Sequence, residues 1–409
     1  MSHPTIDGLK RWLASQALAA TPAERIANHT AETLGALGLP LWRCHVGMSA
    51  LHPQVESIGV TWTRGGADLV ETYGHGSFAS IATTSPFHDA VTSAQRAARD
   101  GRGPEFCIPM TRYRLERGEG LHFSLLSRFR DAGGTDYVCF VAVFGTEGSF
   151  DGPLSGAAIS FTTDRAGGFR DDEIAVLAEV MPPFATALRV AAHVTTTRSL
   201  LDVYLGRDVG GRVLNGEIRR GSVETITAAI LVGDLRGFTT LADTTPSDVL
   251  VAMLDDHLEA LVGAVEERGG QVLKFLGDGL LATFSTHGPR RDCADALDAA
   301  VDALDRTESL RQARGADGRP VAALDLALHA GDVLYGNVGS DRRLDFTVVG
   351  PAVNETARLE LLCSVLDVPL VASGRFVEHV GAPERFRSLG THALRGVRLP
   401  AEVFTIASA

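Results

Sequence analysis

The chain of 409 residues is long enough for two or three domains, and 45% hydrophobic with 22% charged residues is typical of a globular protein. A formal net charge of −12 argues against a general nucleic-acid or anionic-membrane surface, although a few local cations suffice to hold a phosphate chain. The five scattered cysteines form no CxxC pair and the 13 histidines form no zinc motif, so we expect reduced thiols and no zinc site.

The sequence predicts no membrane partner. Its first residues are polar and lack the apolar segment of a signal peptide. The longest apolar stretch, residues 174–194, is interrupted by Glu179, by Pro182-Pro183 and by Arg189. We therefore expect a cytoplasmic protein.

The first part of the chain, residues 20–195, mixes predicted strands and helices. Tyr137 to Phe144 and Ala157 to Thr162 are strand candidates. A long helix is predicted from Phe169 through Arg189, with acidic residues in its first turn. A strand followed by such a closing helix resembles the end of a GAF-type sensor domain. The resemblance implies an unidentified small-molecule or protein signal, and an unrelated α/β domain without a ligand is the alternative.

Residues 196–222 form a predicted connector between two halves. Apolar residues separated by Gly206, Gly210-Gly211 and Gly216 indicate a helix, a break and a short helix. Such a connector either transmits a movement between paired chains or is a passive linker.

From residue 223 to 409 the predicted elements are more sharply bounded. They are a strand at 225–232, a helix that starts at Thr245-Pro246-Ser247-Asp248 and stops at Gly269-Gly270, a hairpin of 271–276 and 280–284, a helix at 291–313, strands at 321–330 and 346–349, and a helix at 352–362. Thr245 is predicted as the helix cap and Pro246 as the first helical residue. The order β-α-β-β-α-β with added C-terminal elements predicts a ferredoxin-like fold of the α/β (α+β) class.

Two aspartates fall at neighbouring strand ends of this predicted sheet. Asp234 follows the strand 225–232, and Asp278 lies at the tip of the hairpin in Gly277-Asp278-Gly279. Carboxylates brought together repel unless a cation lies between them, and Mg²⁺ often binds one or two carboxylates together with substrate phosphates. Taken singly, Asp234 is equally well explained as a helix cap and Asp278 as a turn former.

A second polar set lies further along the chain. Asn354 and Arg358 are four residues apart on a predicted helix and therefore share a face. This pair can orient a sugar oxygen and neutralise phosphate charge, although, taken alone, an amphipathic surface helix is the favoured explanation. Lys274 is one of only two lysines among 38 basic residues, which indicates a site that needs a compact ammonium.

Four motifs make residues 223–409 similar to the catalytic domain of class III nucleotidyl cyclases. They are Asp234-Leu235-Arg236-Gly237-Phe238-Thr239, Lys274-Phe275-Leu276-Gly277-Asp278-Gly279, Gly331 with Gly336-Asn337-Val338-Gly339, and the segment from Phe346 to Leu359. Their order and spacing across nearly half of the chain make the resemblance specific.

The resemblance implies a role for each matching residue. Asp234 and Asp278 match the carboxylates that hold two Mg²⁺ or Mn²⁺ ions per site, with Leu235 beside them. Lys274 matches the lysine that contacts the purine, and Thr347 matches the second base-recognising position, where many members carry aspartate.

Further positions follow from the same resemblance. Asn354 and Arg358 match the ribose- and phosphate-positioning pair. One of Arg395 and Arg398 replaces the triphosphate-binding lysine of the family. Weaker candidates for supporting the metals and phosphates are Ile230 and the backbone of residues 235–239, which include Phe238 and Thr239 as substrate-binding candidates.

Donor and acceptor logic favours ATP as the substrate. Lys274 can donate to adenine N1, and the Thr347 hydroxyl can accept from the 6-amino group. Guanine would suit a glutamate at position 274. The implied reaction is attack of the ribose 3′-oxygen on the α-phosphate, which gives 3′,5′-cyclic AMP and pyrophosphate.

In this family the site forms between two chains, so a chain with both residue sets is expected to form a homodimer. A catalytically weak nucleotide-binding module and a guanylate cyclase are the alternatives. The sequence lacks the Gly-Gly-Asp/Glu-Glu-Phe hairpin of diguanylate cyclases and the P-loop motif of P-loop ATPases.

Overall fold

The structure is a computed structural model that describes residues 4–50, 52–76, 85–99, 108–144 and 156–407. The chain divides into two compact units, Met1–Leu200 and Leu201–Ala409, here called the N-terminal unit and the C-terminal unit.

The N-terminal unit is built on an antiparallel sheet of six strands in the order β3-β2-β1-β6-β5-β4. The strands are β1 (Arg43–Ser49), β2 (Ser57–Thr63), β3 (Leu69–Tyr73), β4 (Met110–Arg114), β5 (Asp136–Val143) and β6 (Gly156–Thr163). The helices are α1 (Ile6–Leu18), α2 (Ala23–Ala36), α4 (Pro86–Arg99), α5 (Ser124–Asp131) and α6 (Asp171–Leu205), with a 3₁₀ turn at Leu115–Arg117.

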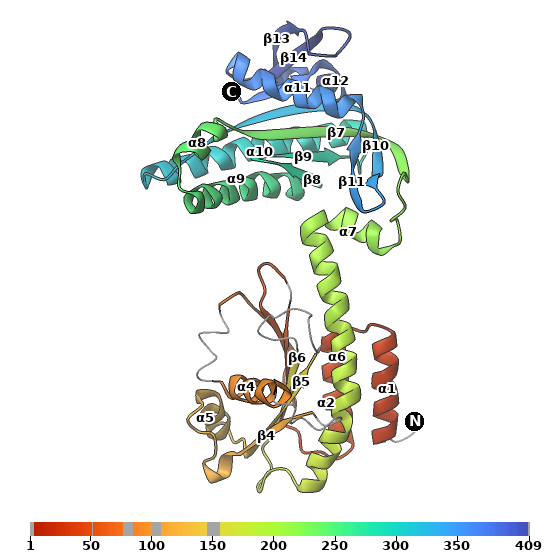
Figure 1. The fold of residues 1–409 in the computed structure, drawn as a ribbon, viewed down its shortest axis with the longest axis vertical. Coiled ribbons are helices and arrows are strands. Elements are labelled where there is room, and N and C mark those ends of the chain that lie inside the picture. Colours follow the sequence, from red (N-terminus) through yellow and green to blue (C-terminus); the bar gives the residue numbers. More distant parts are fainter. Residues whose placement is uncertain (1–3, 51, 77–84, 100–107, 145–155, 408–409) are drawn as a thin grey trace. The chain divides into compact units, whose positions relative to one another are not determined.

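The two faces of this sheet are covered by different helices (Figure 1). Alternate residues of a strand point to opposite faces. Val46, Phe140 and Ile159 therefore pack in one core cluster with residues of α1, α2 and α6. On the other face Tyr137 packs in a second cluster with residues of α4 and α5, such as Leu126. The predicted strands at 137–144 and 157–162 are confirmed.

Helix α6 begins at Asp171, two residues after the predicted start at Phe169, and continues beyond the predicted end at Arg189. Its buried residues Leu177, Val180, Phe184 and Leu188 recur at helical spacing and form its apolar face. The helix continues through Pro182-Pro183 to Leu205. The break at Gly206, which has φ 82°, and the short helix α7 (Arg207–Leu214) follow the pattern predicted for the connector.

Among the described helices, α6 alone is long and apolar enough to cross a membrane by length and composition. This differs from the sequence analysis, in which charged and proline residues interrupt the stretch. Of the 18-residue window that passes the test, 44% is buried inside the structure, and the core helix of a globular protein passes the same test.

The C-terminal unit is built on a sheet of eight strands in the order β13-β14-β12-β10-β7-β9-β8, with β11 paired to β10. The strands are β7 (Val223–Arg236), β8 (Gln271–Leu276), β9 (Gly279–Phe284), β10 (Ala323–Ser340), β11 (Arg343–Val349), β12 (Leu370–Ser373), β13 (Phe386–His392) and β14 (Ala401–Ile406). The helices after α7 are α8 (Phe238–Thr244), α9 (Ser247–Glu267), α10 (Pro289–Ala316), α11 (Pro351–Leu366) and α12 (Gly374–Val380), with a 3₁₀ turn at Pro383–Arg385.

The central strands β10, β7, β9 and β8 are antiparallel neighbours, which is the ferredoxin-like arrangement predicted from the sequence. Helices α9 and α10 pack on one face through a core that includes Leu261, Leu297 and Leu326. Helices α7 and α11, together with β11, contribute to clusters that include Val209, Ile230, Val348 and Leu359.

Several element boundaries differ from the prediction. Helix α9 begins at Ser247 with Pro246 as its cap residue, so the Thr245 cap is wrong by one position. Pro246 is extended at ψ 141° and has no side chain that can cap the helix. Strand β10 continues to Ser340 because it pairs along its length with β7 and then with β11. Strand β11 begins at Arg343, three residues earlier than predicted.

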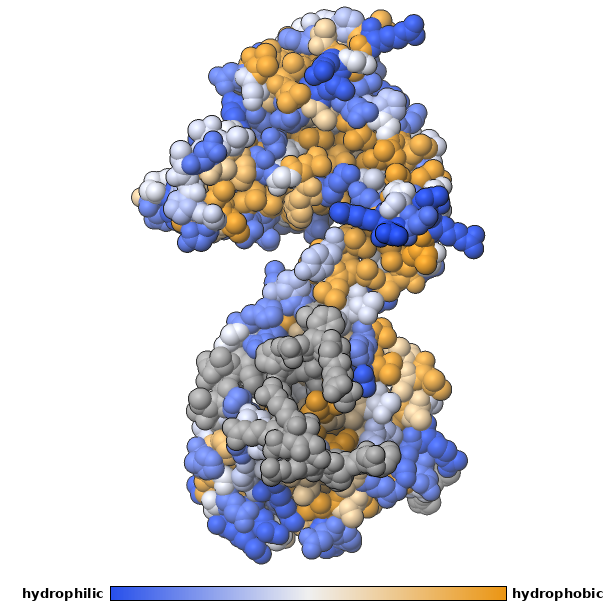
Figure 2. Space-filling view, viewed as in Figure 1, coloured by the Kyte–Doolittle hydropathy of each residue, from blue (hydrophilic) through white to orange (hydrophobic). Residues whose placement is uncertain are grey.

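Apolar side chains remain exposed on the C-terminal unit, and apolar surface is visible on the face shown in Figure 2. They include Phe275, Leu276, Leu344, Val349, Leu361 and Val365. Phe275 on β8 and Leu361 on α11 are 55% and 64% exposed, and exposed apolar side chains of this size can mark an interaction surface.

The cysteines of the described residues, Cys44, Cys139, Cys293 and Cys363, are free and buried, as reduced thiols would be. Cys107 lies outside the described residues.

Candidate active site

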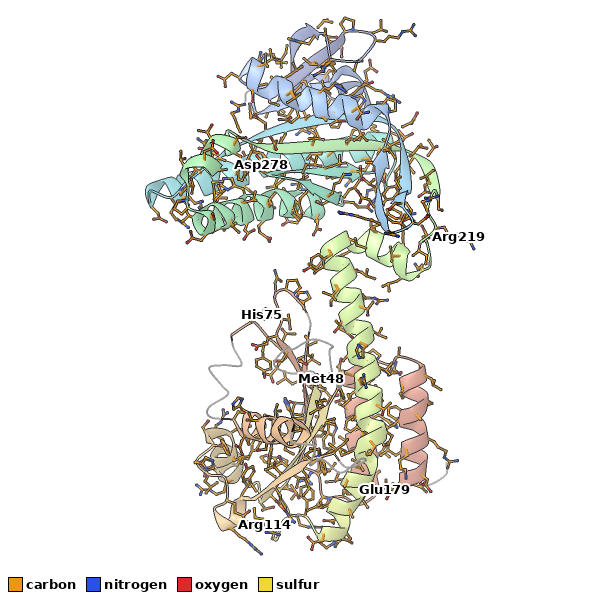
Figure 3. All side chains as sticks on the ribbon, in the orientation of Figure 1. Met48, His75, Arg114, Glu179, Arg219 and Asp278 are labelled. Carbon is orange, nitrogen blue, oxygen red and sulfur yellow. The ribbon has the colours of Figure 1, made fainter. Side chains whose placement is uncertain are left out.

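Asp234 and Asp278 are brought together by the β7–β9 pairing. Gly233 of β7 is the register partner of Leu280 at the start of β9, so the β8–β9 turn lies beside the end of β7. Asp278 occupies this turn (Figure 3), after Gly277 with φ 74°. Gly279 permits the approach, because a Cβ there would lie 2.1 Å from the Gly233 carbonyl oxygen and 2.8 Å from Asp234 Oδ1.

The electrostatics at this corner favour a bound cation. Burial, followed by the charges of Asp278 and Asp325, raises the pKa of Asp234 to about 6. Among the described residues, no group of three or more His, Cys, Asp or Glu side chains is close enough to hold a metal ion. Two adjacent carboxylates nevertheless fit Mg²⁺ or Mn²⁺, because such ions often take one or two carboxylates and fill the remaining positions with water and substrate phosphates.

Sequence reasoning missed the second layer of acidic residues at this corner. Asp325 of β10 is the register partner of Asp234 and is held by Arg236, with 2.6 Å between Arg236 Nη2 and Asp325 Oδ1. Glu360 of α11 has no arginine partner among the residues that the structure describes. Its pKa is raised to about 7 by burial first and then by Asp234, Asp325 and Asp278. The sequence did carry a signal for Glu360. It follows Arg358 by two residues, and residues two apart on a helix point to nearly opposite faces.

The other residues predicted to support the metals and phosphates differ in their burial and in their distance along the chain from Asp234. Leu235 is buried, and its backbone N–H donates to Asp234. Phe238 begins α8 and packs partly against the core, whereas Thr239 beside it is exposed. Ile230 lies in the middle of β7, is fully buried, and pairs with Thr283 and His329 across the sheet. The weak prediction that Ile230 supports the metals is therefore wrong.

Lys274 reaches β11, although its partner differs from the predicted one. Lys274 Nζ lies 3.4 Å from Asp345 Oδ2. Asp345 and Thr347 are two residues apart on β11, so their side chains leave the same face of the strand. Thr347 is 5% exposed, and its hydroxyl is buried without a hydrogen-bond partner among the described residues. A ligand that opens this region would find an ammonium donor and two oxygen acceptors.

Asn354 and Arg358 lie together on an open groove of about 620 Å³ between α11 and the segment before β14. Arg398 lines the same groove with Gly350 at the start of α11. Arg395 is not among the lining residues. Of the two arginines that the sequence left open, Arg398 is therefore the one placed beside Arg358.

Helix α11 separates these two groups of residues within one chain. Asn354 and Arg358 face the groove, whereas the charges of Asp234 and Asp278 help to raise the pKa of Glu360. Two residues span about 200° of an α-helix, so Arg358 and Glu360 point in nearly opposite directions.

The family model described as the adenylate and guanylate cyclase catalytic domain matches residues 222–401. This part of the chain is an adenylate/guanylate cyclase catalytic domain. The match begins one residue before β7 and ends at the start of β14, so the cyclase domain contains both carboxylates, the Lys274 hairpin and the groove.

Curated relatives and solved structures resemble the same region. The chain is 29% identical over 228 residues to an adenylate cyclase of Anabaena cylindrica, covering 53% of this chain and 44% of that protein. It is 27% identical over 174 residues to adenylate cyclase 1 of Rhizobium meliloti (strain 1021), covering 42% of this chain and 26% of that protein. The chain thus spans less than half the length of these relatives.

Among solved structures, the adenylyl cyclase CyaB from P. aeruginosa is 25% identical with a TM-score of 0.43, over 46% of this chain and 97% of that chain. The guanylyl cyclase Cya2 is 25% identical with a TM-score of 0.41, over 45% of this chain and 93% of that chain.

Proposed function

We propose that this protein is an adenylate cyclase that converts ATP into 3′,5′-cyclic AMP and pyrophosphate at sites shared by two copies of the chain. The observation that carries the proposal is the division of the cyclase domain by α11. The carboxylates Asp234 and Asp278 lie on one side, and the groove with Asn354, Arg358 and Arg398 lies on the other. A second copy can bring its groove to the carboxylates of the first.

The base site supports ATP over GTP. Lys274 offers only donors and suits the N1 acceptor of adenine. The Thr347 hydroxyl, which has no hydrogen-bond partner within the described ranges, and the Asp345 carboxylate beside Lys274 are acceptors for the 6-amino group. Guanine presents an N1–H donor where adenine presents the N1 acceptor, so Lys274 would face a donor at that position.

The remaining residues act on the ribose and phosphates. Asp234 and Asp278 would hold two Mg²⁺ or Mn²⁺ ions. When bound, these ions lower the pKa of the 3′-hydroxyl and offset phosphate charge. Asn354 orients the ribose, and Arg358 and Arg398 neutralise the charge that develops on the phosphates.

Exposed apolar residues support the homodimer. Phe275 and Leu276 follow Lys274 on β8, while Leu361 and Val365 follow Arg358 on α11. Their exposure next to the proposed substrate residues is explained if a second copy covers them. A symmetric pair would then contain two equivalent sites.

We further propose that residues 20–195 form a GAF-like regulatory domain, that residues 196–222 connect it to the catalytic domain of residues 223–409, and that the protein acts in the cytoplasm. The central antiparallel sheet with α6 as its closing helix supports the GAF-like assignment.

The substrate assignment is tested with purified full-length protein, Mg²⁺ or Mn²⁺, and ATP or GTP as the nucleotide. We expect cyclic AMP to form faster than cyclic GMP. Equal rates, or cyclic GMP alone, would contradict the roles given to Lys274 and Thr347. A truncated protein that begins near Arg220 is assayed in parallel. Comparing its rate with that of the full-length protein shows whether the N-terminal domain activates or inhibits the reaction.

The shared site is tested by mixing inactive variants. Asp278→Ala and Arg358→Ala are each expected to abolish turnover. A mixed dimer contains one site with neither substitution, so mixing is expected to restore activity. If heterodimers form and activity stays absent, the two-chain site is wrong. Mixing two preparations of Asp278→Ala is the matched control and should restore nothing.

A further inference from the structure

One face of the N-terminal sheet carries polar side chains in its middle. On β1 the burial alternates, so that Cys44 and Val46 enter the core against the helices. Arg43 and His45 therefore point to the opposite face. The register pairs His45 with Thr61 of β2 and with Ser160 of β6, which surrounds it with hydroxyl groups.

Small residues hollow this face into a cavity of about 420 Å³. Gly47 and Gly59 are direct register partners on β1 and β2. The imidazole of His45 lies close to both, since a Cβ at Gly59 would come 3.1 Å from His45 Cε1 and a Cβ at Gly47 would come 3.6 Å from Nε2. Gly156 and Ala158 of β6 also line the cavity. Larger side chains at these positions would fill it.

Arg43 lines the cavity as a cation with unused hydrogen-bonding capacity. Its Nη2 donates to Thr61 Oγ1 at 3.1 Å, and its guanidinium carbon lies 5.2 Å from the ring centre of Phe129. Its Nη1 is buried and has no hydrogen-bond partner in the part of the chain that the structure describes. Burial lowers the pKa of Arg43, but a guanidinium remains protonated in proteins. An anion in the cavity would compensate the charge of this guanidinium.

His45 supplies a second donor. Its Nδ1 lies 2.8 Å from Thr61 Oγ1 and 3.3 Å from Arg43 Nη2, and a guanidinium nitrogen can only donate. Nδ1 is therefore the acceptor, and this network assigns the ring proton to Nε2. Burial lowers the pKa of His45 to about 3, so the ring is neutral at neutral pH and offers Nε2–H.

The remaining wall is mostly apolar and includes an aromatic ring. The ring centre of Phe87 lies 5.1 Å from that of His45. Ile58, Val141 and Met48, which Figure 3 labels, line the same cavity. An apolar wall with a few convergent polar groups is typical of sites for small organic ligands.

Two arginines and one glutamate, Arg43, Arg128 and Glu71, give the lining a net positive charge. We propose that this cavity binds a small aromatic carboxylate, whose carboxylate is held by Arg43 and by His45 Nε2–H and whose ring packs against Phe87. A guanidinium matches a carboxylate in both charge and geometry. The cavity lies within the N-terminal unit, so the proposal does not depend on the cyclase activity.

The test compares an acid with its neutral isostere on the full-length protein. Isothermal titration calorimetry measures binding of 2-naphthoate, 2-naphthamide and acetate. We expect one 2-naphthoate per chain, bound at least about tenfold more tightly than the amide, because a hydrogen bond to a charged partner is lost. Acetate, which lacks the ring, should also bind at least about tenfold more weakly. Equal affinity for acid and amide overturns the proposal, as does the absence of saturable 2-naphthoate binding.

Variants then place the ligand. Arg43→Gln should remove the preference for the acid over the amide, and His45→Phe should weaken 2-naphthoate binding while keeping an aromatic ring. Arg64→Gln is the matched control, since Arg64 pairs with Asp164 at the surface and does not line the cavity. If Arg43→Gln fails to fold, Arg128→Gln tests the charge of the lining and should weaken 2-naphthoate binding more than Arg64→Gln does. Unchanged binding in every folded cavity variant also overturns the proposal.

Discussion

Gly279→Ala should separate Asp234 and Asp278, the two proposed metal-binding carboxylates. Its Cβ would lie 2.1 Å from the Gly233 carbonyl oxygen and 3.1 Å from Asp234 Cα, both backbone atoms that cannot rotate away. The β8–β9 hairpin must therefore move from β7. Overpacking of this kind costs about 3 kcal/mol. For a unit of this size, that lowers the unfolding temperature by about 6 to 12 °C.

The matched control is Gly277→Ala in the same turn. Gly277 has φ 74°, and an added Cβ would meet nothing within 4 Å. The substitution should therefore cost only the penalty of a left-handed backbone, about 1 kcal/mol of unfolding free energy. This lowers the unfolding temperature by about 2 to 4 °C.

Thermal unfolding and cyclic AMP formation are measured on both variants. Gly279→Ala should also lose about a hundredfold in turnover at a temperature where it is folded, because Asp234 and Asp278 are displaced relative to each other. Gly277→Ala should retain most of its turnover. Wild-type stability and turnover in Gly279→Ala, or equal losses in the two variants, would refute the reasoning.

Other predictions concern the charges of the site. The pKa values of Asp234 and Glu360 are raised to about 6 and about 7, so the metal-free protein should lose stability as pH rises through these values. A series of unfolding temperatures measured at increasing pH should show this loss. Added Mn²⁺ should reverse the loss of stability, and Glu360→Gln should make it smaller. Arg398→Ala should raise the KM for ATP much more than Arg395→Ala does, as steady-state kinetics will show, because Arg398 alone of the two lines the groove. Lys274→Arg should impair ATP turnover while leaving the unfolding temperature nearly unchanged, because it keeps the charge and disturbs the fit; wild-type turnover would make the lysine incidental.

The sequence predicted the elements whose signals are local. The hairpin around Gly277-Asp278-Gly279 and the strand that ends near Asp234 are defined by glycines and by β-branched runs, and the structure has both. The spacing of Asn354 and Arg358 placed them on one helix face, and they line one groove.

The sequence could not predict contacts that depend on register and on packing between distant elements. Asp325 lies beside Asp234 only because β10 pairs with β7 in one particular register. The partner of Lys274 is Asp345 because the ends of β8 and β11 meet in the folded sheet. Arg395 and Arg398 are three residues apart, and only the path of the loop before β14 decides which one reaches the groove.

Helix α11 has a consequence for cooperativity. In the proposed dimer its groove side serves one catalytic centre through Arg358, and its other side borders the second centre through Glu360. A small rotation of this single rigid rod would alter phosphate contacts in one centre and the acidic environment in the other. In the proposed dimer we therefore expect nucleotide binding at the first centre to change turnover at the second, so that the two centres are energetically coupled.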